Sequence, residues 1–380
     1  MIFLIIHNEY SKRGGEEHVV EFQKTLLQSY GHSVILYTRN YNELGKTFLG
    51  KIKSTFTSIY NRRSIKDIKC LIEEEKPDIA IVHNVFSIIS PAIISALKKR
   101  NVKVWQIVHN YRMFCPIGIF FHKGEICEKC LGRHREWNCA INNCMDNRFQ
   151  SISFAFKFFM VRKLNYYRGV DRFYTLSYFQ KNKFIANGFD KEKMYYLPNS
   201  FFYQNTVIEE NEGNKKDIGF VGRLTKEKGF YDFIELAKLM PEYSFIVAGE
   251  VTEEIKQIEM PNNLSFEGFL DKQGMENFYN RCRVILFLST WYEGFPMVLV
   301  ESLYYKVPII VNNLSVMAEV VEEGKTGFVM KEKNFNLMKN NIHQLFEDTI
   351  LYTSMRENCQ KEFESKYNVD NYYKNLMKDC

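Results

Sequence analysis

The sequence has no long apolar run. A helix that crosses a bilayer needs about 20 predominantly apolar residues, and the best candidate here extends only from Ile152 to Val161 and contains Lys157. The first residues, Met1 to Ile6, are apolar with no basic leader before them, so we expect no secretory signal peptide. These two features argue against a membrane-spanning or secreted protein, and we expect a cytoplasmic location.

A large excess of one charge is also missing. Lys and Arg outnumber Asp and Glu by 51 to 45, for a formal net charge of +6. This excess is too small and too scattered to predict nucleic-acid binding. The nine cysteines cannot all pair within the chain because their number is odd, and reduced thiols are the rule in a cytosol. No internal repeat or low-complexity tract is visible.

What the sequence does have is a regular alternation of strand-like and helix-like segments. Residues 2–6 form a continuous apolar run, typical of a strand buried on both faces of a parallel sheet, and 16–30 has apolar residues at helical spacing. The strands that we predict are 2–6, 33–37, 79–82, 102–108, 218–221, 245–248, 264–266, 284–288 and 308–311. Strand and helix alternating at this interval are typical of a doubly wound α/β fold.

A chain of 380 residues favours two domains over one. The apolar pattern stops in a polar stretch at 209–216, so we place the boundary there, with one domain over 1–205 and another over 206–348. A cysteine-rich insert at 115–144 belongs to the first domain. Residues 349–380 show no strand pattern, and we expect terminal helices that pack back onto the first domain.

Two cations follow the predicted strand at 218–221. The strand ends in Gly222, and Arg223 and Lys228 then flank a turn before a helix that begins near Phe230. The guanidinium fork of Arg and the point charge of Lys together suit a diphosphate. A solvated basic loop is the alternative interpretation.

Two carboxylates follow the predicted strand at 284–288. Glu293 lies in the loop, Pro296 fits the first position of a new helix, and Glu301 lies within that helix. The N-terminal amides of such a helix favour an anion. Eight residues of helix span about 12 Å, whereas the two carboxylates of a glycosidase lie about 5 to 9.5 Å apart. Two separate contacts are therefore favoured over a paired acid and base.

Glu293 and Glu301, with seven residues between them, resemble the E-x7-E signature of the retaining family 4 glycosyltransferases, which have the GT-B fold. Other short segments are similar to the family in type and order: Gly14-Gly15-Glu16, His83-Asn84, His109-Asn110-Tyr111-Arg112, Cys115-Pro116, Leu197-Pro198-Asn199 and Gly222 to Gly229. The resemblance covers roughly residues 1–345. It implies two Rossmann-like domains that face each other across a cleft, the first for the acceptor and the second for the nucleotide-sugar donor.

The resemblance also implies roles for individual residues. Glu293, His109 and Lys228 match the catalytic positions: Glu293 and His109 near the transferred sugar, and Lys228 with Arg223 on the diphosphate. Glu301 matches the carboxylate that accepts hydrogen bonds from the ribose. The other donor-binding positions that the resemblance implies are Gly15, Gly294, Phe295, Met297 and Val298. The segment 302–308 is bulkier than its counterpart in the family, which affects the shape of the donor pocket.

The implied activity is a retaining transfer of a sugar from a UDP or GDP sugar to a glycan or lipid-linked glycan in surface polysaccharide biosynthesis. The sequence contains no Asp-x-Asp triplet, which counts against the metal-dependent glycosyltransferases, so we expect no cofactor beyond the donor itself. Two alternatives remain: a nucleotide-sugar epimerase of the same fold, which would need additional carboxylates beside the sugar, and a non-catalytic nucleotide-sugar-binding protein.

Two further segments allow two interpretations each. Cys127, Cys130, Cys139 and Cys144 have spacings compatible with a structural zinc site, or they are a group of buried free thiols. The stretch 151–168 interleaves aromatic residues with Lys and Arg. That composition suits peripheral association with an anionic membrane, at its inner face, that carries a lipid-linked sugar, or a core helix with a solvated basic edge.

Overall fold

The computed structural model describes residues 1–9, 14–43, 48–132, 134–202 and 215–380. The chain divides into two compact units: 1–122 with 127–201 and 372–380, and 123–126 with 202–371. The domain boundary predicted between residues 205 and 206, and most of the polar stretch at 209–216, lie outside the described residues. Of the predicted terminal segment, 349–371 falls in the second unit and 372–380 in the first.

The first unit is built on a six-stranded parallel sheet with the order β2-β1-β3-β4-β7-β8. In the strand β1, the four side chains from Phe3 to Ile6 have no exposed surface, as the continuous apolar run predicts. The strands are β1 (Ile2–Glu9), β2 (Ser33–Asn40), β3 (Ile79–Val82), β4 (Lys103–Val108), β7 (Arg172–Thr175) and β8 (Met194–Tyr196), with a short β5 (Phe121–His122) outside the sheet. The predicted strands are confirmed; β7 and β8 were not predicted.

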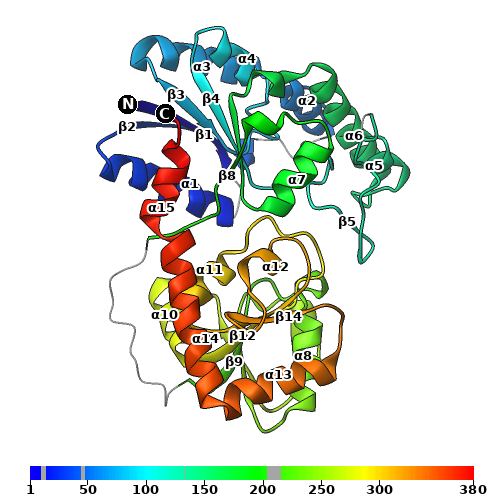
Figure 1. Cartoon of the computed structure of the whole chain (residues 1–380). Coiled ribbons are helices and arrows are strands. Elements are labelled where there is room, and N and C mark those ends of the chain that lie inside the picture. Colours follow the sequence, from blue (N-terminus) through cyan, green and yellow to red (C-terminus); the bar gives the residue numbers. More distant parts are fainter. Residues whose placement is uncertain (10–13, 44–47, 133, 203–214) are drawn as a thin grey trace. The chain divides into compact units, whose positions relative to one another are not determined.

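Helices flank this sheet on both sides (Figure 1). They are α1 (Gly15–Ser29), α2 (Phe48–Ile59), α3 (Arg62–Glu75), α4 (Ile93–Lys98), α5 (Asn138–Ile141), α6 (Arg148–Lys163), α7 (Tyr178–Ala186) and α15 (Val369–Met377). Gln23 of α1 donates a hydrogen bond to the Tyr372 hydroxyl of α15, and the rings of Phe22 and Tyr372 lie 5.0 Å apart. The end of the chain is therefore part of the first unit's packing.

The second unit has its own six-stranded parallel sheet, with the order β11-β10-β9-β12-β13-β14. Its strands are β9 (Asp217–Val221), β10 (Ser244–Ala248), β11 (Leu264–Gly268), β12 (Cys282–Phe287), β13 (Ile309–Asn312) and β14 (Gly327–Met330), and the short β6 (Glu125–Ile126) is separate from it. Its helices are α8 (Phe230–Leu239), α9 (Glu253–Lys256), α10 (Lys272–Arg281), α11 (Met297–Tyr304), α12 (Met317–Val320), α13 (Phe335–Glu347) and α14 (Thr349–Glu362). Strand β14 was not predicted.

In each sheet, the chain adds strands first on one side of a central strand and then on its other side. In the second unit β9 lies between β10 and β12, so the loops that leave β9 and β12 diverge to opposite faces of the sheet. In the first unit β1 lies between β2 and β3 in the same way. Ligands of doubly wound sheets bind at such switch points, beyond the carboxyl ends of the strands. Within the described residues, no helix is both long and apolar enough to cross a membrane.

Candidate active site

The loop after β9 needs glycine at both ends. Gly222 has φ +141°, and Gly229 has φ +80°, values that side chains with a Cβ rarely adopt. A Cβ on Gly229 would lie 2.4 Å from the backbone oxygen of Leu288 at the end of the neighbouring strand. The close approach of the two loops therefore depends on Gly229, and it brings Lys228, the last residue of a 3-10 turn over Lys226–Lys228, beside the loop after β12.

Lys228 is paired with Glu293 there. Its Nζ lies 2.7 Å from Glu293 Oε1, and the two side chains are only 16% and 9% exposed. The same carboxylate oxygen accepts hydrogen bonds from Ser289 Oγ at 2.6 Å and from Trp291 Nε1 at 2.7 Å. Two residues that the sequence places 65 positions apart thus form one desolvated ion pair at the switch point of the second sheet.

Arg223 lies near the same tryptophan but is open to solvent. Its side chain is 62% exposed, with one nitrogen 3.7 Å from Glu227 Oε1, and its guanidinium lies 5.3 Å from the centre of the Trp291 ring. Lys228 Nζ is also 5.3 Å from that ring. One partly buried and one exposed cation therefore lie near the Trp291 ring, and the exposed guanidinium is accessible to an anion.

Glu301 has a different partner. Its Oε2 accepts a hydrogen bond of 2.7 Å from the Tyr279 hydroxyl of α10. Burial raises the pKa of the Glu301 carboxyl, and this hydrogen bond acts in the opposite direction. The Tyr279 ring stacks on Tyr305 with the centroids 5.0 Å apart, which fixes the hydroxyl. Glu293 and Glu301 thus contact separate side chains, in keeping with two separate roles.

The first turn of α11 lies between the two carboxylates in the sequence. Pro296 is the residue before the helix, with φ −69° and ψ 124°, so the helix begins one residue later than predicted. The backbone amides of a first turn have no acceptor within the helix. Met297 and Val298 occupy this turn, preceded by Gly294 and Phe295.

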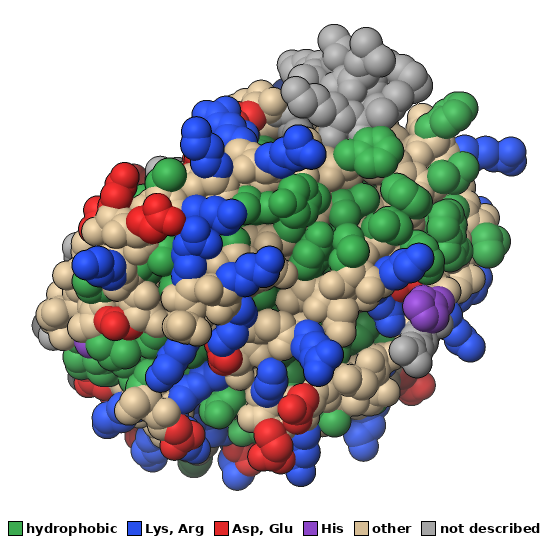
Figure 2. Space-filling view, turned by 90° about the horizontal axis from the view of Figure 1, so that it is seen from above, with side chains coloured by type: hydrophobic (Ala, Val, Ile, Leu, Met, Phe, Trp, Pro, Cys, Tyr) green, Lys and Arg blue, Asp and Glu red, His purple; other side chains and the backbone are tan. Residues whose placement is uncertain are grey.

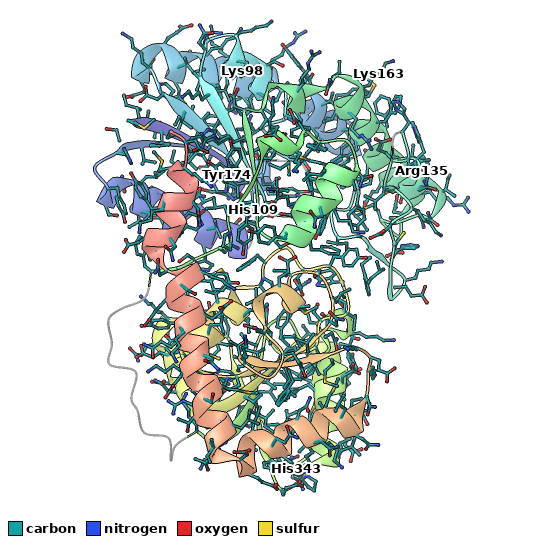
Figure 3. The ribbon with its side chains drawn as sticks, viewed as in Figure 1. Lys98, His109, Arg135, Lys163, Tyr174 and His343 are labelled. Atoms are coloured by element: carbon teal, nitrogen blue, oxygen red, sulfur yellow. The ribbon has the colours of Figure 1, made fainter. Side chains whose placement is uncertain are left out.

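In the first unit, His109 follows β4 and His83 follows β3, and the two rings are in contact (Figure 3 labels His109). His83 Nδ1 lies 2.8 Å from His109 Nε2, and the rings stack with an interplanar angle of 17°. Burial lowers the pKa of His109, and it lowers that of His83 further below its usual range. Both imidazoles are therefore neutral at pH 7, and one ring N–H donates to the lone pair of the other.

Both histidines line a pocket beyond the carboxyl ends of β3 and β4. It encloses about 350 Å³, including the open mouth, and its other lining residues include Asn84, Phe86, Gln106, Arg112 and Tyr167. Asn110 Nδ2, next to His109, donates to Glu16 Oε1 at 3.1 Å, which joins this pocket to the first turn of α1. Gly15, the first residue of α1, has no atom within 4 Å of where a Cβ would be.

The cysteines of the insert gather around a second pocket of the first unit. Its lining includes Cys115, Cys127, Cys130, Cys139 and Cys144. Burial raises the pKa of the Cys130 and Cys139 thiols, and Cys130 and Cys139 belong to an apolar cluster with Ala155. No group of three or more His, Cys, Asp or Glu side chains in the described ranges is arranged to hold a metal ion. The structure thus brings the five thiols of the insert to one pocket, where several of them are buried.

Several contacts of the candidate site were missed from the sequence. Ser289 directly follows a predicted strand, and Trp291 is one of only three tryptophans. Both positions could therefore have been proposed as site residues from the sequence. Tyr279 lies on the helix before β12, and nothing in the sequence indicates that it contacts Glu301. His83 was noted as part of a motif, but not as the partner of His109.

The chain is similar to known proteins over both units. Residues 204–362 match the family model described as glycosyl transferases group 1. A Klebsiella pneumoniae protein named "Uncharacterized 42.6 kDa protein in cps region" is 27% identical over 276 residues, which cover 72% of this chain and 67% of that protein. The "Capsular polysaccharide biosynthesis glycosyltransferase CapM" of Staphylococcus aureus is 28% identical over 40% of this chain and 42% of its own length. The chain thus aligns with about two thirds of the length of the first relative and about two fifths of the second.

Solved structures match nearly the whole chain. The crystal structure of Anabaena Alr3699/HepE in complex with UDP has a TM-score of 0.67 at 17% sequence identity, and the alignment covers 99% of this chain and 98% of that one. At this identity the likeness establishes the fold, which is GT-B, with a six-stranded parallel sheet in each unit. Residues 204–362 are thus similar to the group 1 glycosyl transferases, and the whole chain shares the GT-B fold of these solved structures.

Proposed function

We propose that the chain transfers a sugar from a UDP-sugar to a glycan or lipid-linked glycan in surface polysaccharide biosynthesis, with retention of the anomeric configuration. The observation that carries this proposal is the Lys228–Glu293 pair at the switch point of the second sheet. The solved relative Alr3699/HepE was crystallised with UDP and with UDP-glucose, which supports a uridine donor. The names of the capsule-region relatives support the polysaccharide context.

The two cations would hold the donor's diphosphate. Transfer breaks the bond between the sugar carbon and the diphosphate oxygen, so negative charge grows on the diphosphate. The acceptor hydroxyl oxygen bonds to the sugar, and its proton passes to the departing diphosphate. Fixed cations that face this growing charge stabilise the transition state. Lys228 is mostly buried and oriented by Glu293, whereas Arg223 is exposed and can close over a phosphate with its planar fork. The amides of the first α11 turn add a partial positive charge on the same side.

Glu293 would face the transferred sugar. When a phosphate takes over contacts of Lys228, the carboxylate still accepts hydrogen bonds from Ser289 and Trp291, so it keeps its position. A fixed carboxylate beside a sugar that acquires positive charge stabilises that charge. Glu301, held by Tyr279, would accept hydrogen bonds from the ribose hydroxyls. Neither carboxylate needs a metal ion for these roles, so no cofactor besides the donor is included in the proposal.

The first unit would supply the acceptor side. His109 lines a pocket with both apolar and hydrogen-bonding walls, and its neutral imidazole can donate to or accept from a sugar hydroxyl. Gly15 leaves open space at the start of α1, into which a ligand group can fit. We place the reaction in the cytoplasm, where reduced thiols are the rule.

The test is a thermal-shift screen of UDP and GDP sugars, followed by product analysis. A ligand at 100 times its dissociation constant stabilises the protein by about 2.7 kcal/mol, so the true donor should raise the melting temperature clearly. Transfer to an acceptor glycan, with the anomeric configuration read by NMR, would then support the proposal. Conversion of the donor to its epimer without any acceptor would support the epimerase instead, and stabilisation without turnover of any kind would support a binding protein.

A further inference from the structure

The first unit has an exposed apolar face built from α2, α5 and α6. Phe56 of α2 is 59% exposed, and Phe149 and Ile152 of α6 are 79% and 50% exposed. Figure 2 shows hydrophobic side chains gathered on one part of this side of the molecule, with Lys and Arg around them. The large exposed apolar residues of these helices and their ends are Phe56, Tyr60, Trp137, Ile141, Phe149, Ile152 and Leu164. We call this surface the α2–α6 face.

The helices of this face are packed side by side, so the exposed residues form one surface. Thr55 Oγ1 of α2 and Ser153 Oγ of α6 are hydrogen-bonded at 2.6 Å, and the rings of Phe56 and Phe156 lie 6.4 Å apart. Trp137, just before α5, contacts Phe159 of α6 with the ring centroids 5.9 Å apart. A contiguous exposed apolar surface of this kind marks an interaction site.

The charges around this face are mostly positive. Neither α2 nor α6 contains Asp or Glu, and Arg148, Lys163 and Arg168 are exposed on or just after α6. Within the described part of the chain, Arg148 and Lys163 form no ion pair; Figure 3 labels Lys163 at the end of α6. Asp146 is the exposed acid next to this set in the sequence. The face therefore combines an apolar centre with a basic rim.

Two cations of the aromatic and basic stretch 151–168 do not belong to this basic rim. Lys157 is 4% exposed and lies 3.4 Å from the centre of the Phe154 ring, and burial lowers its pKa to about 7. Arg162 is paired with Glu136 at 2.6 Å. The helix thus has a core side, as the alternative interpretation expected, and an exposed side that the core does not use.

We propose that the α2–α6 face docks on a bilayer that contains anionic lipids. Aromatic side chains with Lys and Arg beside them are typical of proteins that lie at a membrane interface. A second copy of this chain would bring the same cations against each other, which opposes self-association through this face. A nucleic-acid duplex would engage the cations, but its stacked bases would leave the exposed Phe149 and Ile152 uncovered.

The core side of α6 lies next to the pocket of His109. Phe158, on the core side of α6, packs against Phe86 with the ring centroids 4.6 Å apart. Phe86 and Tyr167 line that pocket and belong to the same apolar cluster as Phe158. A lipid-linked acceptor in the bilayer would therefore be delivered next to this pocket. This consequence rests on the proposed function, whereas the docking itself does not.

Vesicle co-sedimentation tests the docking without donor or acceptor. The full chain should bind vesicles with about one third phosphatidylglycerol and not pure phosphatidylcholine, and about 0.5 M NaCl should weaken the binding. Arg148→Glu with Lys163→Glu should lower the partition coefficient at least about 30-fold, since each cation near an anionic surface contributes a factor of about five. Phe149→Ser should lower it at least about tenfold, at high salt as well.

Matched control variants come from the second unit. Lys272→Glu with Lys331→Glu makes the same change in net charge at two exposed sites, and Phe269→Ser removes a ring that is 87% exposed. Both should bind vesicles like the unmodified chain. Equal losses in the control and test variants, or no binding to anionic vesicles at low salt, would overturn the docking. So would a concentration-dependent dimer that Phe149→Ser dissociates, because it would assign the face to a second copy.

Stabilisation of each variant by UDP, measured without vesicles, separates the two proposals. Retained stabilisation with lost vesicle binding identifies a defect of docking alone. Vesicle binding by a chain that no nucleotide sugar stabilises would instead refute the proposed function and leave the docking intact.

Discussion

Replacing Lys228 by alanine removes the cation that faces Glu293 and leaves the rest of the loop after β9 in place. In the structure its Nζ is 2.7 Å from Glu293 Oε1, with 16% of the lysine side chain exposed. If this cation faces the donor's diphosphate, its contact becomes stronger as charge grows on the departing oxygen. Only contacts that strengthen in the transition state raise the catalytic rate, so kcat, rather than KM, should carry the loss.

The substitution should lower both the turnover number and the stability, and the two losses have separate causes. Loss of one preorganised donor at a developing negative charge lowers kcat by about 100-fold or more. Breaking a buried pair from one side costs about 3 to 5 kcal/mol of stability, and the lower end applies because Ser289 and Trp291 still donate to the remaining carboxylate. The variant should therefore fold, with a lower unfolding midpoint and a much lower turnover number.

The assay is steady-state transfer with the donor found in the nucleotide-sugar screen, at several donor concentrations. Lys238→Ala is the matched control, because Lys238 is 47% exposed and its one ion pair among the described residues is with Glu235 on the same helix; its kcat should be unchanged. Near-normal turnover by folded Lys228→Ala would refute the assignment of this lysine to the diphosphate. If Lys228→Ala combined with Glu293→Gln is no slower than Glu293→Gln alone, the lysine acts only by holding the carboxylate.

Three further outcomes are expected. Glu301→Gln should raise the donor KM about 10- to 150-fold with a small change in kcat, since hydrogen bonds to a charged group are worth about 1.5 to 3 kcal/mol, and an unchanged KM would place the ribose elsewhere. Burial lowers the pKa of His83 below the value of 6.5 that we take for the unfolded chain. The free energy of unfolding should therefore fall as the pH drops below 6.5, by up to about 1.4 kcal/mol per pH unit. His83→Gln should make this pH dependence weaker, as measured by urea unfolding at two pH values. Maleimide at pH 8 should label the exposed Cys70 and Cys380 quickly and the buried Cys139 slowly, and rapid labelling of Cys139 would contradict its burial.

Strands made of an unbroken apolar run could be predicted, because burial on both faces favours such a run. β1 and β12 are of this kind. The missed strands have weaker patterns: β7 begins with the half-buried Arg172, and β14 starts with Gly327, which has poor strand propensity and is required by close contact with the backbone of Ile309. Contacts of β14 with the neighbouring β13, rather than local propensity, make it a strand, whereas β7 is a short segment whose Phe, Tyr and Thr do favour a strand.

The residues of the candidate site could be located by their motifs, but their partners could not. Lys228 follows β9 and Glu293 follows β12, and β10 and β11 lie between them in the sequence. Only the sheet order, which makes β9 and β12 neighbours, brings the two side chains together. The same limit applies to Tyr279 and Glu301, because the orientation of α10 over the sheet determines their contact.

The Lys228–Glu293 pair also separates a transferase from a protein that only binds nucleotide sugars. A buried carboxylate competes with a phosphate for the same ammonium group, so it opposes diphosphate binding and is useful only if it acts on the sugar. Glu293→Gln should therefore leave UDP affinity unchanged or higher, while transfer falls about 100-fold or more. Calorimetry with UDP and the transfer assay give the two values. Clearly weaker UDP binding by a folded Glu293→Gln variant would show that the carboxylate serves the nucleotide, and would leave the transfer mechanism without its sugar-facing group.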